Sequence, residues 1–177
     1  MLGQVFSLTL LSLLLGSLYS LMALGLTMTF SISRFANFAH AEYVTIGAYT
    51  AVLIINMYGL GFAEAVIAAF ITSAIIALLS DELVFKPLFN FGATSLQLLT
   101  ASIGVGLAIR YALSILADIH GMLCIQPRIT PKPILRVLGA TVSTLHIWAL
   151  PTAVIIVIIL HLILTRTKLG KAMRAMA

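Results

Sequence analysis

The residues best suited to chemistry lie between positions 33 and 42, where Asn37, His40 and Glu42 stand among aromatic and small side chains. His40 and Glu42 are two positions apart, without the second histidine that a zinc site needs, and neither holds a nucleophile. The segment is therefore a poor enzyme site. At membrane depth, however, a broken helix offers free N–H and C=O groups to a polar solute. The pattern favours equally a functional break and an ordinary cytoplasmic turn.

A second candidate is Arg110, which stands well inside an apolar run. It belongs to a stripe at steps of four residues, Ser102, Gly106, Arg110 and Ser114. An unpaired arginine near the bilayer centre raises the free energy of insertion by at least about 2.5 kcal/mol, so its charge must be stabilised. The charge could be stabilised in three ways: by snorkelling to the outer interface, by an ion pair with Asp118 or Glu64, or by direct contact with a solute.

Small and hydroxyl side chains also follow one face of the first apolar segment. They are Thr9, Ser12, Gly16, Ser20, Ala23 and Thr27. In lipid, small residues let helix backbones approach closely. We expect this face to pack against protein, with Gly16, Ser20 and Ala23 at the contact and Gly106 in the same role further along. A smaller possibility is that the hydroxyls also line a solute path.

The elements that carry these residues must be membrane-spanning helices. The chain has 177 residues, 62% of them hydrophobic and 8% charged, and a bilayer core of ~30 Å takes about 20 apolar residues per helix. This predicts an all-α, polytopic transmembrane helical bundle of about five spans. The expected spans are 5–30, 43–57, 62–79, 96–116 and 145–164. We expect the chain to form one transmembrane domain over residues 1–177.

The connections are expected at four places: the possible broken helix near residues 31–42, a turn at Gly59 and Gly61, a polar connection over 80–94, and a loop over 117–144. The last contains Pro127, Pro131 and Pro133 and is therefore not one regular helix. Cys124 is the only cysteine, which excludes an intrachain disulfide and a cysteine-cluster metal site.

The basic residues report membrane orientation. They are neither interleaved with aromatic residues nor gathered on a soluble face, which argues against nucleic-acid binding. With five full spans and the C-terminus inside, the larger group is cytoplasmic: Arg34, Lys86, Arg166, Lys168, Lys171 and Arg174. The smaller group, Arg128, Lys132 and Arg136, is then external, as is the N-terminus. If the second span is only a half-helix, the N-terminus changes sides.

Residues 165–177 form a basic end directly after the last span. Such an end is typical of a cytoplasmic anchor near anionic lipid. Its small residues, among them Gly170 and Ala172, also suit a short helix that docks closely on a protein partner.

Several ordered motifs together resemble the permease subunits of branched-chain amino acid ABC importers. These motifs are the run 16–28, Asn37-Phe38-Ala39-His40 with Glu42, Gly47-Ala48-Tyr49, Glu82 with Phe85-Lys86-Pro87-Leu88, the run 100–105, and the run 166–175. The resemblance covers nearly the whole chain. Two departures are Ala41, where the family usually has glycine, and Leu83, where it usually has arginine.

The resemblance implies a multi-pass inner-membrane (cell membrane) permease without catalytic activity, cofactor or metal of its own. ATP would be hydrolysed by cytoplasmic ATP-binding cassette subunits, with a second permease subunit and an extracytoplasmic solute-binding protein as further partners. Asn37, His40, Glu42 and Arg110 would belong to the solute path. The start of the ATPase-coupling segment would comprise Arg166, Lys168, Gly170, Lys171 and Arg174.

The chain stops within this coupling segment, whereas relatives continue. We therefore expect that the 177-residue chain alone does not complete ATP-coupled transport. An alternative function is a non-transporting interaction or assembly subunit, or an inactive fragment of such a permease. An intramembrane enzyme built on His40 and Glu42 is a distant third reading.

Overall fold

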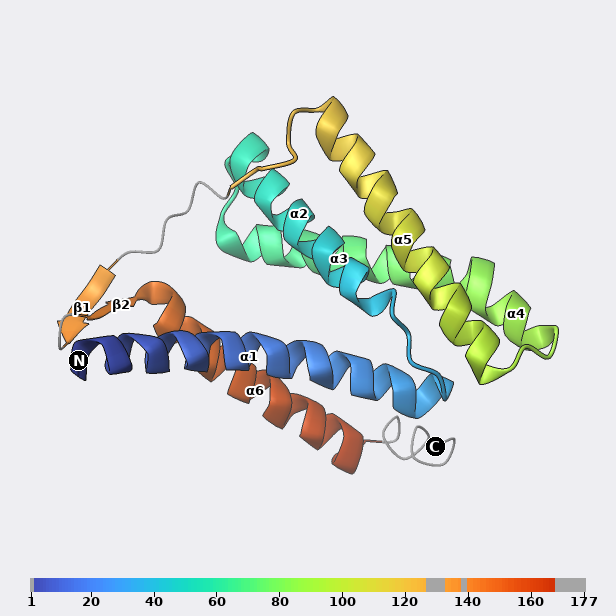
Figure 1. The fold of residues 1–177 in the computed structure, drawn as a ribbon, viewed down its shortest axis with the longest axis horizontal. Coiled ribbons are helices and arrows are strands. Elements are labelled where there is room, and N and C mark those ends of the chain that lie inside the picture. The colour runs from blue at the N-terminus through green and yellow to red at the C-terminus, as the bar shows by residue number, and fades with distance from the viewer. Residues whose placement is uncertain (1, 127–132, 138–139, 168–177) are drawn as a thin grey trace. The chain divides into compact units, whose positions relative to one another are not determined.

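The computed structural model describes residues 2–126, 133–137 and 140–167. Within these ranges the helices are α1 (Leu2–Ser33), α2 (His40–Tyr58), α3 (Phe62–Ser80), α4 (Lys86–Asn90), α5 (Ser95–Ile119) and α6 (Thr144–Arg166), and a π-helical segment, η1 (Asp81–Phe85), joins α3 to α4 (Figure 1). A small antiparallel hairpin pairs β1 (Pro133–Val137) with β2 (Ala140–Ser143). The chain divides into two compact units, residues 33–129 and residues 1–32 with 130–177.

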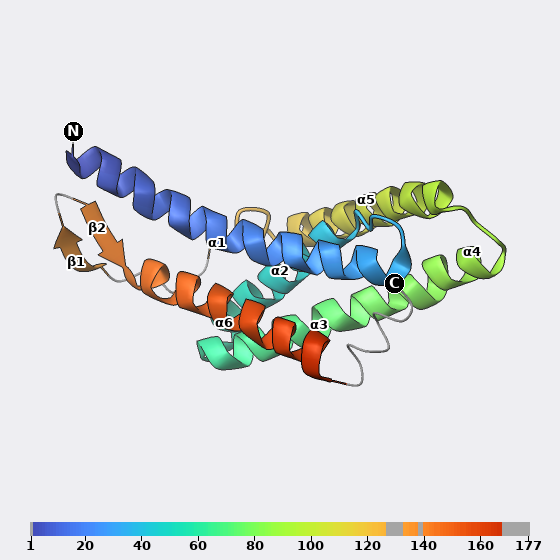
Figure 2. The same cartoon turned by 90° about the horizontal axis from the view of Figure 1, so that it is seen from below.

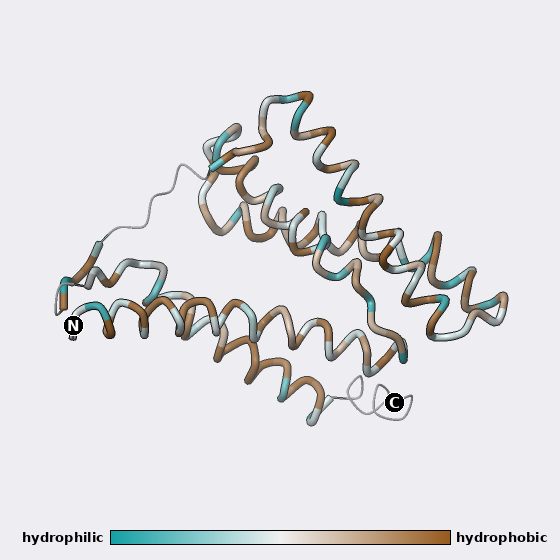
Figure 3. Tube along the Cα trace, viewed as in Figure 1, coloured by the Kyte–Doolittle hydropathy of each residue, from teal (hydrophilic) through white to brown (hydrophobic). Residues whose placement is uncertain are grey.

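The all-α, polytopic architecture predicted from the sequence is confirmed. Four helical segments are long and apolar enough to cross a bilayer: Gly3–Ser33, Phe62–Asn90, Ser95–Ile119 and His146–Arg166. Apolar residues dominate α3 and α6, whereas polar residues gather in the connection that precedes α2 (Figure 3). α2 is the helix that the five-span expectation counted in addition to these four.

One predicted connection is wrong. Residues 80–94 were expected to form a polar linker, but the α3 helix continues through η1 and α4 to Asn90, a course that can be followed in Figures 1 and 2. The π-helical turn inserts an extra residue into the helical repeat. It brings Phe85 to the inside, with 5% of its surface exposed, while Glu82 and Lys86 form an exposed ion pair of 2.6 Å. The connection proper begins only at Phe91, and Gly92 there has a φ of 80°.

The larger unit is held together by α2 and α3, an antiparallel helix pair that turns at Gly59, whose φ is 62°. The Ser73 hydroxyl donates to the Tyr43 carbonyl at 2.8 Å, and Thr72 bonds Thr50 at 3.1 Å. A Cβ atom added at Gly47 would lie 2.8 Å from the Ser73 Oγ, so this glycine permits the close approach of the two helices.

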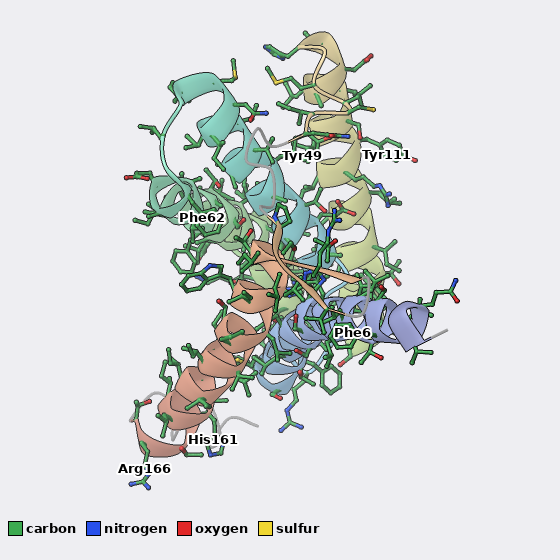
Figure 4. The ribbon with its side chains drawn as sticks, turned by 90° about the vertical axis from the view of Figure 1, so that its left-hand side faces the viewer. Phe6, Tyr49, Phe62, Tyr111, His161 and Arg166 are labelled. Atoms are coloured by element: carbon green, nitrogen blue, oxygen red, sulfur yellow. The ribbon has the colours of Figure 1, made fainter. Side chains whose placement is uncertain are left out.

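The smaller unit contains α1, the hairpin and α6. Ser143 and His146 form a capping box at the start of α6, which satisfies backbone N–H groups there. The end of α6 carries His161 and Arg166 (Figure 4). The expectation that 117–144 is not one regular helix is confirmed in its described part, since α5 ends at Ile119 and the hairpin follows.

Candidate functional site

The segment that joins α1 to α2, residues 34–39, lies along α5. Phe35 is buried at its start and contacts Phe85, with ring centroids 5.3 Å apart, and both belong to one apolar cluster with Leu98. Arg34 precedes it with a φ of 60°, the one positive φ of a non-glycine residue in the described part of the chain. The backbone therefore turns sharply at Arg34, and the Phe35 cluster fixes where the segment begins.

Ser102 of α5 holds the middle of this segment. Its hydroxyl is completely buried, accepts a hydrogen bond from the Phe38 N–H at 3.0 Å, and lies within bonding distance of the carbonyls of Ala36 (3.3 Å) and Leu99 (2.7 Å). One side chain thus satisfies polar backbone groups of a non-helical segment, which a buried connection requires.

Asn37 stabilises the end of the segment through local hydrogen bonds. Its Oδ1 accepts the Ala39 N–H at 3.0 Å, and its carbonyl accepts the His40 N–H at 3.2 Å. The side chain is 7% exposed, so it braces the turn that starts α2. His40 begins α2 and is half-buried.

Gly106 lies where α5 faces the start of α2, at a distance that would accommodate a Cβ atom in ordinary van der Waals contact. A Cβ atom built there would lie 3.5 Å from the Cα of Ala39 and 3.8 Å from the Cγ of Glu42. Ala39 has no exposed surface. The contact falls near the midpoint of α5, about 16 Å along the helix from Ser95 at ~1.5 Å per residue.

One turn further along α5, the Arg110 Nη1 lies 3.9 Å from the Glu42 Oε1. Neither of the ion-pair partners expected from the sequence, Asp118 or Glu64, takes this place. The sequence does not reveal that α2 begins beside this part of α5. With this pair, three successive members of the α5 stripe, Ser102, Gly106 and Arg110, face residues 36–42.

The far end of α2 is tied to the chain that follows α5. The Tyr49 hydroxyl donates to the Leu123 carbonyl at 3.2 Å, and the Asn56 amide donates to the Gln126 carbonyl at 2.7 Å. Tyr49 and Tyr111 are labelled near this end of the unit in Figure 4. α2 therefore starts beside the middle of α5 and ends beside the chain that follows α5.

The structure also brings together residues that sequence reasoning did not select. Phe35 and Phe85 anchor the segment, and Tyr43 is buried with a hydroxyl that has no hydrogen-bond partner among the described residues. Ser102 was noticed as part of a stripe, but its role in holding the segment was missed, because the stripe alone does not say what it faces.

The remaining predicted residues are less enclosed. Gly16, Ser20 and Ala23 on α1 are exposed, and a Cβ atom at Gly16 would meet nothing within 4 Å. Gly16 and Ser20 line a groove of about 370 Å³ between α1 and α6, opposite Ala153 and Val157. The expected tight packing of Gly16 is thus not made inside this unit and stays a prediction about other segments.

Among the predicted coupling residues, Arg166 is exposed in the last turn of α6. The others, Lys168, Gly170, Lys171 and Arg174, lie outside the described residues. No group of three or more His, Cys, Asp or Glu side chains that could hold a metal ion occurs in the described part of the chain.

Residues 8–177 match the family described as "Branched-chain amino acid transport system / permease component". The chain belongs to this family. It is 28% identical over 174 residues to the high-affinity branched-chain amino acid transport system permease protein BraD of Pseudomonas aeruginosa, covering 92% of this chain and 55% of that protein. It is 27% identical over 162 residues to the probable branched-chain amino acid transport permease protein LivH of Methanocaldococcus jannaschii, covering 90% of this chain and 50% of that protein.

The chain thus spans about half the length of these curated relatives, and no solved structure matches it. Membership of the family and the four apolar helices agree on a multi-pass protein of the cell membrane.

Proposed function

We propose that this chain is a transmembrane permease subunit of an ABC importer for branched-chain or related amino acids. The observation that carries the proposal is the polar break held against the middle of α5, in a chain that belongs to a permease family. Because α5 is a candidate membrane span, a break that runs from Leu98 to Gly106 along it would carry backbone polar groups into the bilayer and start α2 near its middle.

In this proposal the polar residues at the break have two different roles. Asn37 and Ser102 brace the backbone of the segment, since Asn37 accepts the Ala39 N–H and Ser102 accepts the Phe38 N–H. His40, Glu42 and Arg110 stand beyond it and contribute side chains to the solute path. Non-helical backbone at membrane depth is characteristic of transporters whose broken helices meet the solute.

Transport would depend on the partners that the family implies. Cytoplasmic ATP-binding cassette subunits would hydrolyse ATP and engage the basic end that starts at Arg166, a second permease subunit would complete the pathway, and a solute-binding protein would deliver the amino acid. The exposed position of Arg166 at the end of α6 supports such a contact.

The test is uptake of radiolabelled L-leucine by cells whose copy of this gene is deleted and then restored. We expect deletion to lower uptake, the gene to restore it, and His40→Ala to fail to restore it at equal membrane expression. A suitable control is Thr45→Ala, because among the described residues the Thr45 hydroxyl bonds within α2, to the Ala41 carbonyl. Restored uptake with His40→Ala would remove His40 from the path.

The same deletion strain distinguishes a role in transport from a role in assembly. If the chain is instead an assembly subunit, its deletion lowers the amount of the second permease subunit in the membrane, and supplying that subunit from a stronger promoter restores uptake without this chain.

A further inference from the structure

The ion pair between Arg110 and Glu42 is loose and unequally buried. The Nη1 to Oε1 distance of 3.9 Å is longer than a hydrogen bond, and the Arg110 side chain is 67% exposed whereas that of Glu42 is 14% exposed. The five N–H donors of a guanidinium therefore remain largely available on the exposed side.

This chain has few acidic side chains available to pair with Arg110. Of its five acidic residues, Glu82 is paired with Lys86, and among the described residues only Glu42 has a carboxylate within 4.0 Å of Arg110. Arg110 stands about 22 Å along a helix of roughly 37 Å, a depth at which an unpaired charge is costly. Its exposed side must therefore meet water, another polypeptide or a solute.

Small residues leave space beside the pair. Gly106 lies one turn before Arg110 and Ala39 lies one turn before Glu42, and a Cβ atom built at Gly106 would still lie 3.5 Å from the Cα of Ala39. Glu42 also sits in the first turn of α2, where the helix dipole favours its negative charge. A fixed negative charge and an available positive charge thus stand side by side.

We propose that Arg110 and Glu42 recognise the head group of a zwitterionic amino acid, with its α-carboxylate on the Arg110 guanidinium and its α-ammonium on the Glu42 carboxylate. The solute enters between the two side chains and replaces one long contact by two charge-assisted hydrogen bonds. Because solute and pair are each neutral overall, less charge is left uncompensated than with a single ion. This inference rests on the proposed function and names the side chains that would hold the head group of its solute.

The test measures binding of three probes to the purified full chain in lipid nanodiscs by ligand-observed NMR titration. The probes are L-leucine, L-leucinamide, which lacks the carboxylate, and 4-methylpentanoate, which lacks the ammonium. For the wild-type chain we expect each analogue to bind about tenfold more weakly than leucine, the effect of one charge-assisted hydrogen bond.

Each substitution should abolish the discrimination between leucine and one of the two analogues. Arg110→Gln should weaken leucine about tenfold and bind leucine and leucinamide alike, whereas Glu42→Gln should bind leucine and 4-methylpentanoate alike. Arg110→Lys should retain part of the preference for a carboxylate, which guards against a general folding defect. Glu64→Gln, a carboxylate in the first turn of α3, is the matched control and should leave all three affinities unchanged.

Three results would overturn the site. They are unchanged discrimination in both variants, no leucine binding by the wild-type chain, or an Arg110→Gln variant that loses only its co-purification with the second permease subunit. If cells still lose leucine uptake on deletion of the gene, the proposed function stands although the site is refuted. If deletion leaves leucine uptake unchanged, the proposed function itself fails.

Discussion

Ser102 is the residue on which the position of the 34–39 segment depends most directly. It is fully buried and bonds backbone groups of both Ala36 and Phe38, two residues that no helix satisfies. Removing its hydroxyl leaves the Phe38 N–H without an acceptor in a region shielded from water, which costs more than losing an exposed hydrogen bond.

Ser102→Ala should therefore lower the free energy of unfolding by about 1–3 kcal/mol, measured as unfolding of the detergent-purified chain. Ser114→Ala is the matched control: Ser114 belongs to the same stripe but bonds neither Ala36 nor Phe38 in the described structure. Equal stability of the two variants would show that the segment is held by packing alone.

Tyr43 presents the opposite case, a buried polar atom with no partner among the described residues. A buried unsatisfied hydroxyl is destabilising. Tyr43→Phe keeps the aromatic packing and should leave the midpoint of thermal unfolding unchanged or raise it, whereas Tyr43→Ala should lower it strongly. A clear loss of stability in Tyr43→Phe would mean that the hydroxyl has a partner, such as water or another subunit.

At the scale of elements, the structure depends on how closely α5 approaches the start of α2. Gly104 and Gly106 have the same helical backbone two positions apart, but their surroundings differ. A Cβ atom at Gly106 meets Ala39 at 3.5 Å, whereas one at Gly104 meets nothing within 4 Å.

Gly106→Leu should consequently destabilise the unit by about 1–3 kcal/mol, while Gly104→Leu should be tolerated. Helix propensity changes equally in both, so the difference reports packing. Thermal unfolding of the two purified variants measures it. Similar losses in both would contradict the α2–α5 contact; a similar loss only in the assembled complex would indicate that Gly104 meets a partner.

The helices themselves could be predicted well, because long apolar runs bounded by polar residues leave few alternatives in a bilayer. The expected spans 62–79 and 96–116, for example, lie within α3 and α5. The expected connection at 80–94 is wrong because this stretch is polar, with Asp81, Glu82 and Lys86 in it, and still continues the helix to Asn90. In fact their exposure on one side of the extended α3 is compatible with a helix whose other side buries Phe85.

The candidate site could be predicted in its parts but not in its assembly. The sequence shows that the break at 33–42 and the stripe on α5 are both unusual, but their contact depends on which helices are neighbours. A single sequence does not contain that information, so it offers Asp118 and Glu64 as ion-pair partners of Arg110, whereas the structure pairs Arg110 with Glu42.

At the scale of the whole molecule, the orientation of the chain in the membrane is open to a direct test. Phe35 contacts Phe85 and Leu98, so Arg34 and Lys86 belong to the same end of their unit, in agreement with their shared cytoplasmic assignment. With this assignment we expect the chain after α5, including the exposed Cys124, to lie outside, and we expect the basic end after α6 to lie inside.

In oriented vesicles, a membrane-impermeant maleimide should label the wild-type chain at Cys124 from the external face. The variant Cys124→Ser with Lys168→Cys should be labelled from the cytoplasmic face only. The native cysteine thus serves as the control for sidedness. External labelling at position 168 would overturn both the orientation and the proposed contact with the ATPase subunits.

The short α2 has a consequence for how the protein is made. It is not among the four helices that are apolar enough to span a membrane, and it carries His40 and Glu42 in its first turn. Its neighbour α3 is apolar, follows after a tight turn at Gly59 and packs closely through Gly47 and Ser73. We therefore expect that during synthesis α2 gains its place only when α3 has left the ribosome, and that the two enter the bilayer as one hairpin. A nascent chain halted just after Tyr58 would leave α2 accessible to protease, and one halted well beyond Ser80 would protect it.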